Sequence, residues 1–140
     1  MEVKGKLQDG TKVTANMLNS DSVAWGNYYN ASFDVKRKEG LYTTPPSTKD
    51  SWTTTENYTK PSSDVLLTTG AADRNSVLGI YDLAGNVFEW TLEYTANTRR
   101  PCAYRGGDYS SSGSSLPASH RNGVSTTGVS GNVGFRPALW

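Results

Sequence analysis

Apolar residues occur along this chain in short groups, and their clearest alternation with polar residues lies past its middle. Phe88, Trp90 and Leu92 take every second position between Val87 and Glu93. A period of two places alternate side chains on the same face of an extended strand. We therefore predict a strand here, with its aromatic face directed into the core.

The residues before this strand predict a bend and a second apolar wall. Leu78, Ile80 and Tyr81 would supply the wall, and Gly85-Asn86 would link it to the strand. Glycine and asparagine tolerate a left-handed backbone better than other residues do. The two segments should therefore pack against each other across the bend.

The first quarter of the chain predicts further extended structure. Residues 3–7 and 12–15 flank Asp9-Gly10, a pair that favours the turn of a β-hairpin. Residues 31–35 predict a strand, and the charged run 36–40 predicts a solvated turn.

Between these parts, residues 43–69 are rich in Thr, Ser, Pro and Asp and predict a long irregular insertion. A few large apolar side chains would hold it in place. The aromatic residues between Trp25 and Tyr29 are candidates for the core.

Three motifs in the second half of the chain carry a resemblance to a known family. They are residues 79–91 (GIYDLAGNVFEWT), 105–109 (RGGDY) and 134–139 (GFRPAL). In this order they resemble the C-terminal half of the formylglycine-generating, sulfatase-modifying family, whose fold is C-type-lectin-like. The resemblance implies an α+β fold of short strands and long irregular loops. We expect residues 1–140, the length of one domain, to form a single trimmed version of it.

The enzymes of that family are oxidases, and this chain lacks the residues that their chemistry needs. The enzymes carry a pair of cysteines shortly after the motif at 105–109, which hold copper and handle the substrate thiol. Here the only cysteine is Cys102, which precedes that motif. Thiolates select copper(I), and hydroxyl groups do not replace them. We expect no enzymatic activity, with a trimmed oxidase as the alternative.

A hydrolytic relay is also disfavoured. The single histidine, His120, would have to serve any Ser-His-Asp relay, and no serine lies in a Gly-x-Ser-x-Gly motif. A solvent-facing contact residue is the preferred interpretation of His120.

The stretch from Asp108 to Val133 resembles the variable region of proteins diversified by retroelements, a group that includes phage tropism determinants. In it, 16 of 26 residues are Ser, Gly, Thr or Asn, with single aromatic, charged and apolar residues among them. Randomised adenines in AAC codons would leave such a mixture, and tyrosine among small polar residues also suits binding loops. A flexible linker is the alternative.

This second resemblance implies a variable ligand-binding segment at about 105–136 on a rigid scaffold. We expect Tyr109, Leu116 and His120 to contribute most of the binding free energy, because a few large side chains usually dominate an interface. Many serines suggest modest affinity per copy, which an oligomer or a particle-borne prophage protein would amplify. A purely structural particle protein is the alternative. The candidate contact residues are Asp108, Tyr109, Ser110, Ser111, Ser112, Ser114, Ser115, Leu116, His120, Asn122, Val124, Ser125, Val129 and Ser130.

The motifs on either side should hold the ends of this segment together. Residues 105–107 and 134–136 predict paired strand ends, because glycines permit close approach of two backbones. Phe135 would anchor the returning strand in the core. Arg136 would reach a buried carboxylate or carbonyl group.

The bend before residue 88 also carries a candidate metal site. In sulfatase-modifying enzymes the matching positions form a structural calcium site, with side chains at Asp82 and Glu89 and backbone carbonyls at Gly85 and Val87. Oxygen ligands of mixed carboxylate and carbonyl origin suit calcium. In the alternative, Asp82 caps the turn and Glu89 accepts backbone hydrogen bonds without a metal. We expect no other cofactor.

Charge and cysteine content limit the classes of partner and location. Lysine and arginine total 14 against 13 for aspartate and glutamate, so we expect no nucleic-acid partner. One cysteine excludes an internal disulfide, and no apolar run has the length of a signal-peptide core or a membrane span. We expect synthesis in the cytoplasm and no membrane insertion. The expected partner is a protein or other macromolecular ligand on a target surface. Whether the protein is displayed on a phage particle or on a cell surface stays open.

Overall fold

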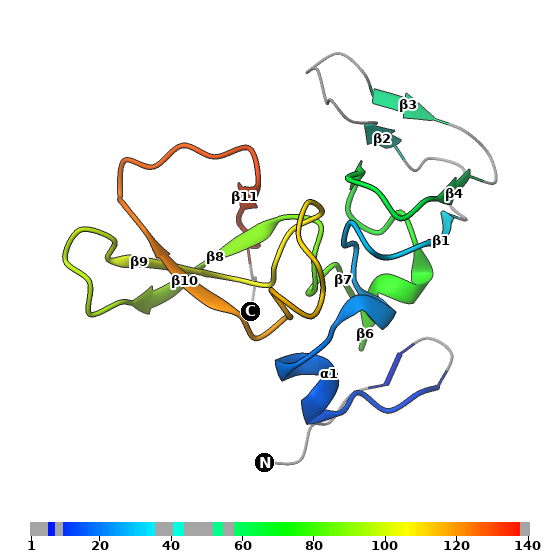
Figure 1. The fold of residues 1–140 in the computed structure, drawn as a ribbon, viewed down its shortest axis with the longest axis horizontal. Helices are drawn as coiled ribbons and strands as arrows, with labels where there is room; N and C mark the ends of the chain where they lie inside the picture. The colour runs from blue at the N-terminus through cyan, green and yellow to red at the C-terminus, as the bar shows by residue number, and fades with distance from the viewer. Residues whose placement is uncertain (1–5, 8–9, 36–40, 44–51, 55–57, 138–140) are drawn as a thin grey trace.

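The computed structural model describes residues 6–7, 10–35, 41–43, 52–54 and 58–137. Figure 1 shows two parts, which we call the body (the described residues up to 87, with 106–120) and the arm (residues 88–105 and 121–134). In chain order, the elements are α1 (Ala15–Asn19), η1 (Val23–Trp25), β1 (Phe33–Val35), β2 (Leu41–Thr43), β3 (Trp52–Thr54), β4 (Tyr58–Lys60), β5 (Leu66–Leu67), η2 (Asp73–Asn75), β6 (Ser76–Val77), β7 (Ile80–Tyr81), β8 (Phe88–Tyr94), β9 (Cys102–Arg105), β10 (Arg121–Val124) and β11 (Val133–Gly134).

Three small antiparallel sheets surround the core of the body. β1 pairs with β4, β2 lies between β3 and β5, and β6 pairs with β7. Trp25, Tyr28, Val35 and Val65 are each at most 1% exposed. Full burial of such a side chain stabilises a fold by roughly 1.5–3 kcal/mol. The predicted aromatic core near residue 25 is therefore confirmed for Trp25 and Tyr28 but not for Tyr29, which is 43% exposed, and the strand predicted at 31–35 is confirmed for residues 33–35.

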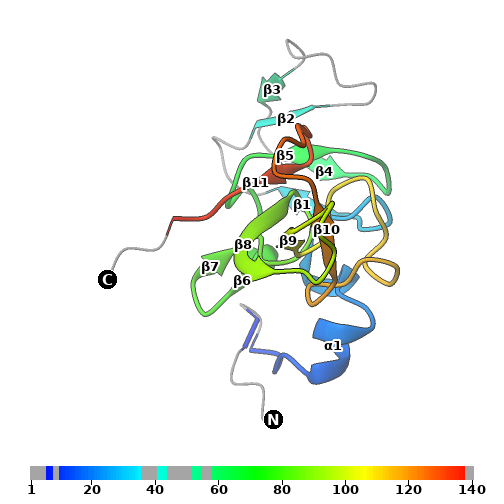
Figure 2. The same ribbon diagram turned by 90° about the vertical axis from the view of Figure 1, so that its left-hand side faces the viewer.

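The arm is a four-stranded sheet in the order β10-β9-β8-β11. β9 pairs antiparallel with both β8 and β10, whereas β11 pairs parallel with the start of β8. The arm projects to one side of the body in Figure 1, and in Figure 2, where it faces the viewer, α1 lies below it and β2 and β3 lie above it.

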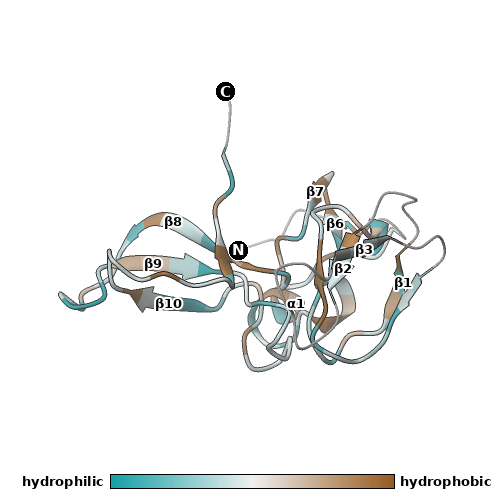
Figure 3. Cartoon of the chain, turned by 90° about the horizontal axis from the view of Figure 1, so that it is seen from above, coloured by the Kyte–Doolittle hydropathy of each residue, from teal (hydrophilic) through white to brown (hydrophobic). Residues whose placement is uncertain are grey.

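The predicted strand at 88–92 is confirmed as β8, but the burial predicted for its aromatic face is only partly correct. Phe88 is buried, Trp90 is half-buried, and Leu92 is fully exposed at 106%. The strand leaves the core and enters the arm, and its register with β9 shifts between Trp90 and Tyr94. Figure 3 shows apolar and polar residues side by side along the arm strands.

The second apolar wall was predicted wrongly for two of its three residues, while the third, Tyr81, is half-buried. Leu78 and Ile80 are exposed, because they lie at and beside the turn between β6 and β7. Val77, the preceding residue, is buried in their place and forms a bridge with Leu7.

The insertion predicted as irregular at 43–69 contains strands β3, β4 and β5. At the end of β4, Lys60 is completely buried, and its Nζ donates hydrogen bonds of 2.8–3.0 Å to the carbonyl oxygens of Tyr28, Ala31, Pro61 and Ser63. Burial lowers the pKa of this amine to about 8. The ammonium group thus links the turn at residues 28–31 to the turn at residues 61–63 through buried hydrogen bonds. The sequence pattern did not predict this role.

The predicted hairpin near Asp9-Gly10 is supported by an antiparallel bridge between Lys6 and Lys12. Residues 1–5 and 8–9 lie outside the described residues, as does the charged run 36–40. Ala15 begins α1 and does not continue the second strand, because the Thr14 side chain caps the helix by accepting a hydrogen bond from the Met17 amide. No helix in the described part of the chain is long and apolar enough to cross a membrane.

Candidate functional site

The base of the arm is fixed by the predicted turn at Gly85-Asn86. Both residues have positive φ, 68° and 62°, as expected for a left-handed backbone. The buried Asn86 side chain accepts hydrogen bonds from Asn27 Nδ2 at 2.9 Å and the Leu67 amide at 3.1 Å, and donates to Leu67 O at 2.9 Å. The turn therefore holds three separated segments together where β8 begins.

The first part of the candidate segment, residues 108–119, packs against residues 18–30 of the body, and we call it the tethered half. The Ser22 amide donates to Gly113 O at 3.1 Å, and the Tyr29 amide donates to Ser111 O at 3.0 Å. The Ala118 amide donates to Ser22 Oγ at 2.9 Å. These bonds fix the path of the tethered half along residues 22–29.

The buried Asp108 side chain fixes the start of the tethered half through hydrogen bonds. It is only 2% exposed, and its carboxylate accepts hydrogen bonds from Ser110 Oγ at 3.0 Å, Ser111 Oγ, and Asn132 Nδ2 at 2.6 Å. The carboxylate thereby joins the beginning of the segment to its end. Asp108 was predicted as a ligand contact, and its burial corrects this assignment, because its oxygens face internal donors.

The second part begins with β10 and continues into residues 125–131, which we call the open loop. The Gly128 amide donates to Ser125 O at 3.0 Å, and the Asn132 amide donates to Ser130 Oγ at 3.2 Å. The hydrogen bonds of this loop, among the described residues, stay within 125–132. Residues 126–131 are exposed, including the Val129 side chain.

The candidate contact residues fall into three groups. Those that are exposed are Ser110, Ser114, Ser115, Asn122, Val129 and Ser130. Those that are half-buried are Tyr109, Ser111, Ser112, Leu116, His120, Val124 and Ser125, and Asp108 alone of the candidates is buried.

The three residues predicted to dominate binding are all half-buried. The Tyr109 hydroxyl donates to Asn132 Oδ1 at 3.4 Å, and the Leu116 amide donates to Ser112 O at 3.0 Å. Burial lowers the pKa of the His120 imidazole, which favours its neutral form at pH 7. Each therefore offers only part of its side chain to a partner.

The motifs at the two ends of the segment were predicted to pair with each other, and this prediction is wrong. β9 and β11 instead lie on opposite sides of β8. Phe135 is 78% exposed and does not anchor the core. Arg136 does reach a carboxylate and a carbonyl, although both partners are half-buried and not buried as predicted: its Nη2 lies 2.5 Å from Glu89 Oε1 and 2.8 Å from Tyr81 O.

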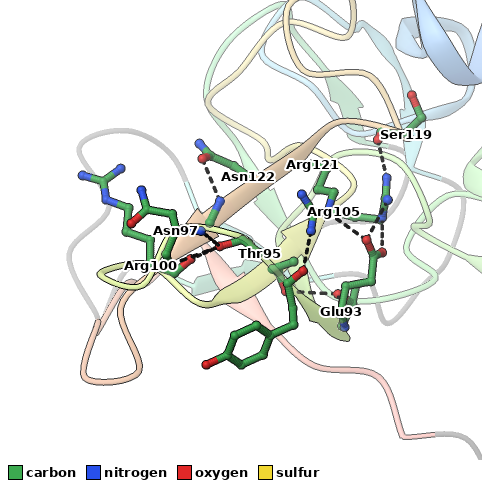
Figure 4. A network of polar contacts seen from close by, with 12 residues as sticks. Glu93, Thr95, Asn97, Arg100, Arg105, Ser119, Arg121 and Asn122 are labelled. Atoms are coloured by element: carbon green, nitrogen blue, oxygen red, sulfur yellow. Dashed lines mark hydrogen bonds and ion pairs between the residues drawn. The ribbon is translucent and has the colours of Figure 1, made fainter.

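A cluster of charges on the arm was missed by the sequence analysis. Glu93 accepts a hydrogen bond from Arg105 Nε at 2.5 Å and another from Arg121 Nε at 2.9 Å (Figure 4). Arg105 Nη1 also donates to Ser119 O at 2.6 Å. The two arginines lower the pKa of Glu93 to about 2. These residues lie 12 and 28 positions from Glu93, so only the pairing of β8, β9 and β10 brings them together.

A family model described as a sulfatase-modifying factor enzyme 1-like domain matches residues 6–139. The chain belongs to this family. The family has a C-type-lectin-like fold, and the sheet-rich structure agrees with this part of the prediction. The α+β class stays a prediction, because α1 is the single α-helix among the described residues. Neither the curated proteins nor the solved structures include a significant match.

As a sulfatase-modifying-factor-like domain, the chain lacks the second thiol of the family's oxidases. Cys102 is half-buried on β9, where it lies opposite Tyr94 and Val124 in the two neighbouring strands. It is the only cysteine of the sequence. The donor set therefore does not fit a copper site with paired thiolates.

The positions of the family's calcium site form other contacts here. Asp82 accepts hydrogen bonds from the Gly70 amide at 2.8 Å and from Asn75 Nδ2 at 3.2 Å, while burial raises its pKa. Glu89 pairs with Arg136. Asp82 thus accepts hydrogen bonds as in the metal-free alternative, whereas the donor to Glu89 is the Arg136 side chain and not a backbone amide. Calcium binding by Asp82, Glu89 and the carbonyls of Gly85 and Val87 stays a prediction.

Proposed function

We propose that this domain is a non-enzymatic binding protein that recognises a macromolecular ligand through the exposed side chains of residues 109–130. The observation that carries the proposal is the open loop. Its residues 126–131 are exposed and its hydrogen bonds are internal, whereas the segment before it is hydrogen-bonded to the body. A rigid base with exchangeable side chains limits the ordering cost of binding. The exposed candidate residues form the proposed contact surface together with the half-buried Tyr109, Leu116 and His120.

The braced base is what separates this segment from a flexible linker. Asn86 fixes the start of β8, and Asp108 joins the two ends of the segment through Asn132. Substitutions at the fully exposed Val129 would therefore change the surface without removing any contact of the base.

We also propose that a retroelement diversifies this segment and that several copies act together on a particle or a cell surface. The composition of residues 108–133 supports the first part. The small side chains of the exposed serines support the second, because weak contacts gain from multivalent display.

One test concerns natural variation. The gene segment would be sequenced in a natural population, and the neighbouring DNA searched for a near-copy rich in AAC codons. Differences confined to adenine positions at codons of exposed residues would support diversification. An invariant segment without a template would leave a binding protein of fixed specificity.

A second test concerns the surface itself. A display library would randomise Ser114, Asn122, Val129 and Ser130, and would be selected on hen lysozyme, a folded protein that serves only as a probe. Folded, lysozyme-binding variants should be recovered. A matched library at the buried positions Asp108 and Gly113 should lose folding, because these positions contact the body or internal donors. Equal folding and equal recovery from both libraries would contradict the proposal.

The two alternatives predict different outcomes. A trimmed oxidase would lose activity on replacement of Cys102 by Ser. A structural particle protein would fail to assemble when Tyr109, Leu116 and His120 are all replaced by Ala, whereas a binding protein would still assemble and would lose attachment to its ligand.

A further inference from the structure

The end of the arm farthest from the body combines exposed apolar side chains with arginines. Leu92 is fully exposed and Tyr94 is 79% exposed, both on β8. Arg99 and Arg100 are exposed in the loop that joins β8 to β9. We call Leu92, Tyr94, Arg99 and Arg100 the arm tip; Arg121, which begins β10 at the body end of the arm, lies outside it.

The arm tip carries an excess of positive charge. From residue 88 to residue 136 there are five arginines and no lysine, against three acidic side chains. One of the three, Asp108, is buried, and Glu89 is paired with Arg136. Glu93 is therefore the one acidic side chain left to balance the charge of four arginines, and it pairs with two of them, Arg105 and Arg121. Arg99 and Arg100 have no ion pair among the described residues.

The loop that carries these arginines is held in one shape. Thr95 Oγ1 donates to Arg100 O at 2.5 Å, and the Thr95 amide donates to Pro101 O at 2.8 Å. Arg121 Nη2 donates to Tyr94 O at 2.8 Å, which ties β10 to the exposed end of β8. In Figure 4 the Arg100 side chain extends away from the Glu93 cluster. The arginines thus stand on a preorganised hairpin.

We propose that the arm tip is a second contact surface, which binds an acidic region of a partner protein. Tyrosine and arginine are the residue types most enriched where protein interfaces derive their affinity, and exposed Leu92 adds apolar area beside them. Carboxylates of the partner would pair with Arg99 and Arg100, whose planar guanidinium groups suit bidentate contacts. A second copy of this chain is disfavoured as the occupant, because two arm tips would place like charges opposite each other.

This surface lies outside the proposed variable surface, except that β10 connects the two. Gly123 follows Arg121 by two residues and packs against the hairpin loop: a Cβ added there would lie 2.7 Å from Arg100 O. The open loop begins two residues later. A partner could therefore contact the fixed arginines and the exchangeable loop together, but the arm tip does not require the loop to be variable.

The experiment measures binding of the full chain to a fluorescent twelve-residue peptide of alternating Glu and Asp with one Leu and one Tyr. The peptide should bind. Raising the salt concentration from about 50 to about 300 mM should lower its affinity, because salt screens the attraction between opposite charges. The double variant Arg99→Glu/Arg100→Glu should lose at least tenfold in affinity. Tyr94→Ser should reduce the affinity further, with the fold retained in both variants by circular dichroism.

The matched control reverses two exposed charges of the body, Lys6→Glu and Lys12→Glu, and leaves the affinity within about twofold. Equal loss in the control and the arm variant would overturn the proposal, as would no binding of the peptide. Preferential, arm-dependent binding of a 20-base-pair DNA duplex would overturn it in favour of nucleic acid. The variants Val129→Glu and Ser130→Glu test the proposed variable surface separately, so either proposal can fail alone.

Discussion

The tethered half and the open loop have similar compositions and opposite environments. Both consist mainly of serine, threonine and glycine. The tethered half exchanges hydrogen bonds with residues 18–30 of the body, whereas the open loop bonds within itself. The difference shows that small polar residues can build a scaffold as well as an exposed surface. The distinction depends on whether a partner segment lies alongside.

The two halves also use glycine differently. A Cβ added at Gly113 would lie 2.5 Å from the Val23 amide nitrogen, whereas one added at Gly131 would meet nothing within 4 Å. The first glycine permits close packing of two backbones, and the second lies in open space. This contrast allows the comparison to be tested with the same substitution in each half.

Hydrogen exchange should show the largest difference. The amides of Ser111 and Leu116 donate to carbonyls within the tethered half, while those of Val129 and Gly131 have no acceptor among the described residues. We expect protection on the order of a hundredfold or more for the first pair and near none for the second, since loops with few contacts open easily. Measurement by NMR at pH 7 would check this. Equal protection would remove the distinction between the halves.

Gly113→Ala should destabilise the domain by about 2–3 kcal/mol, because the added methyl group would force two backbones apart. Gly131→Ala is the matched control and should change the free energy of unfolding by no more than about 0.5 kcal/mol. Urea unfolding of both variants gives the comparison. A loss at position 131 as large as that at 113 would show that the open loop is packed after all.

Asp108→Ala should cost about 1–2 kcal/mol, because Asn132 Nδ2 and two serine hydroxyls would lose their acceptor. The double variant Asp108→Ala/Asn132→Ala should lose less free energy of unfolding than the sum of the two single losses if the two residues act as one link. Val129→Ala, at a fully exposed position outside the link, serves as the control. Full additivity of the first two changes would mean that Asp108 stabilises the tethered half alone.

The smallest expected effect concerns pH. The pKa of Glu93 is about 2 in the fold, below its ordinary value of 4.5, because Arg105 and Arg121 donate hydrogen bonds to it. The folded form binds fewer protons than the unfolded form in this range, so the contribution is complete above about pH 4.5 and is lost as the pH falls toward 2. The difference in melting temperature between wild type and Glu93→Gln should therefore be present at pH 7 and disappear near pH 2. It should be small, because the pair is exposed. A difference that persists at pH 2 would point to a packing role.

Local features of the sequence determined several elements correctly. The left-handed turn at Gly85-Asn86, the strand at 88–94 and the contact of Arg136 with a carboxylate follow from residue type and from motif. The motifs at 79–91, 105–109 and 134–139 also led to the family that the match over residues 6–139 establishes. Backbone preference and motif are encoded within a few neighbouring residues, so sequence alone can reveal them.

Tertiary structure decided which side chains are covered. Periodicity placed Leu92 in the core, although the strand leaves the body before that residue, and no local signal marks where it leaves. Lys60 is buried because four carbonyl groups from two separate turns surround its amine. The division of one polar segment into a tethered half and an open loop likewise depends on residues 18–30 lying beside only one of them. Burial and hydrogen-bond partners are properties of distant segments brought together, and composition within a segment does not contain them.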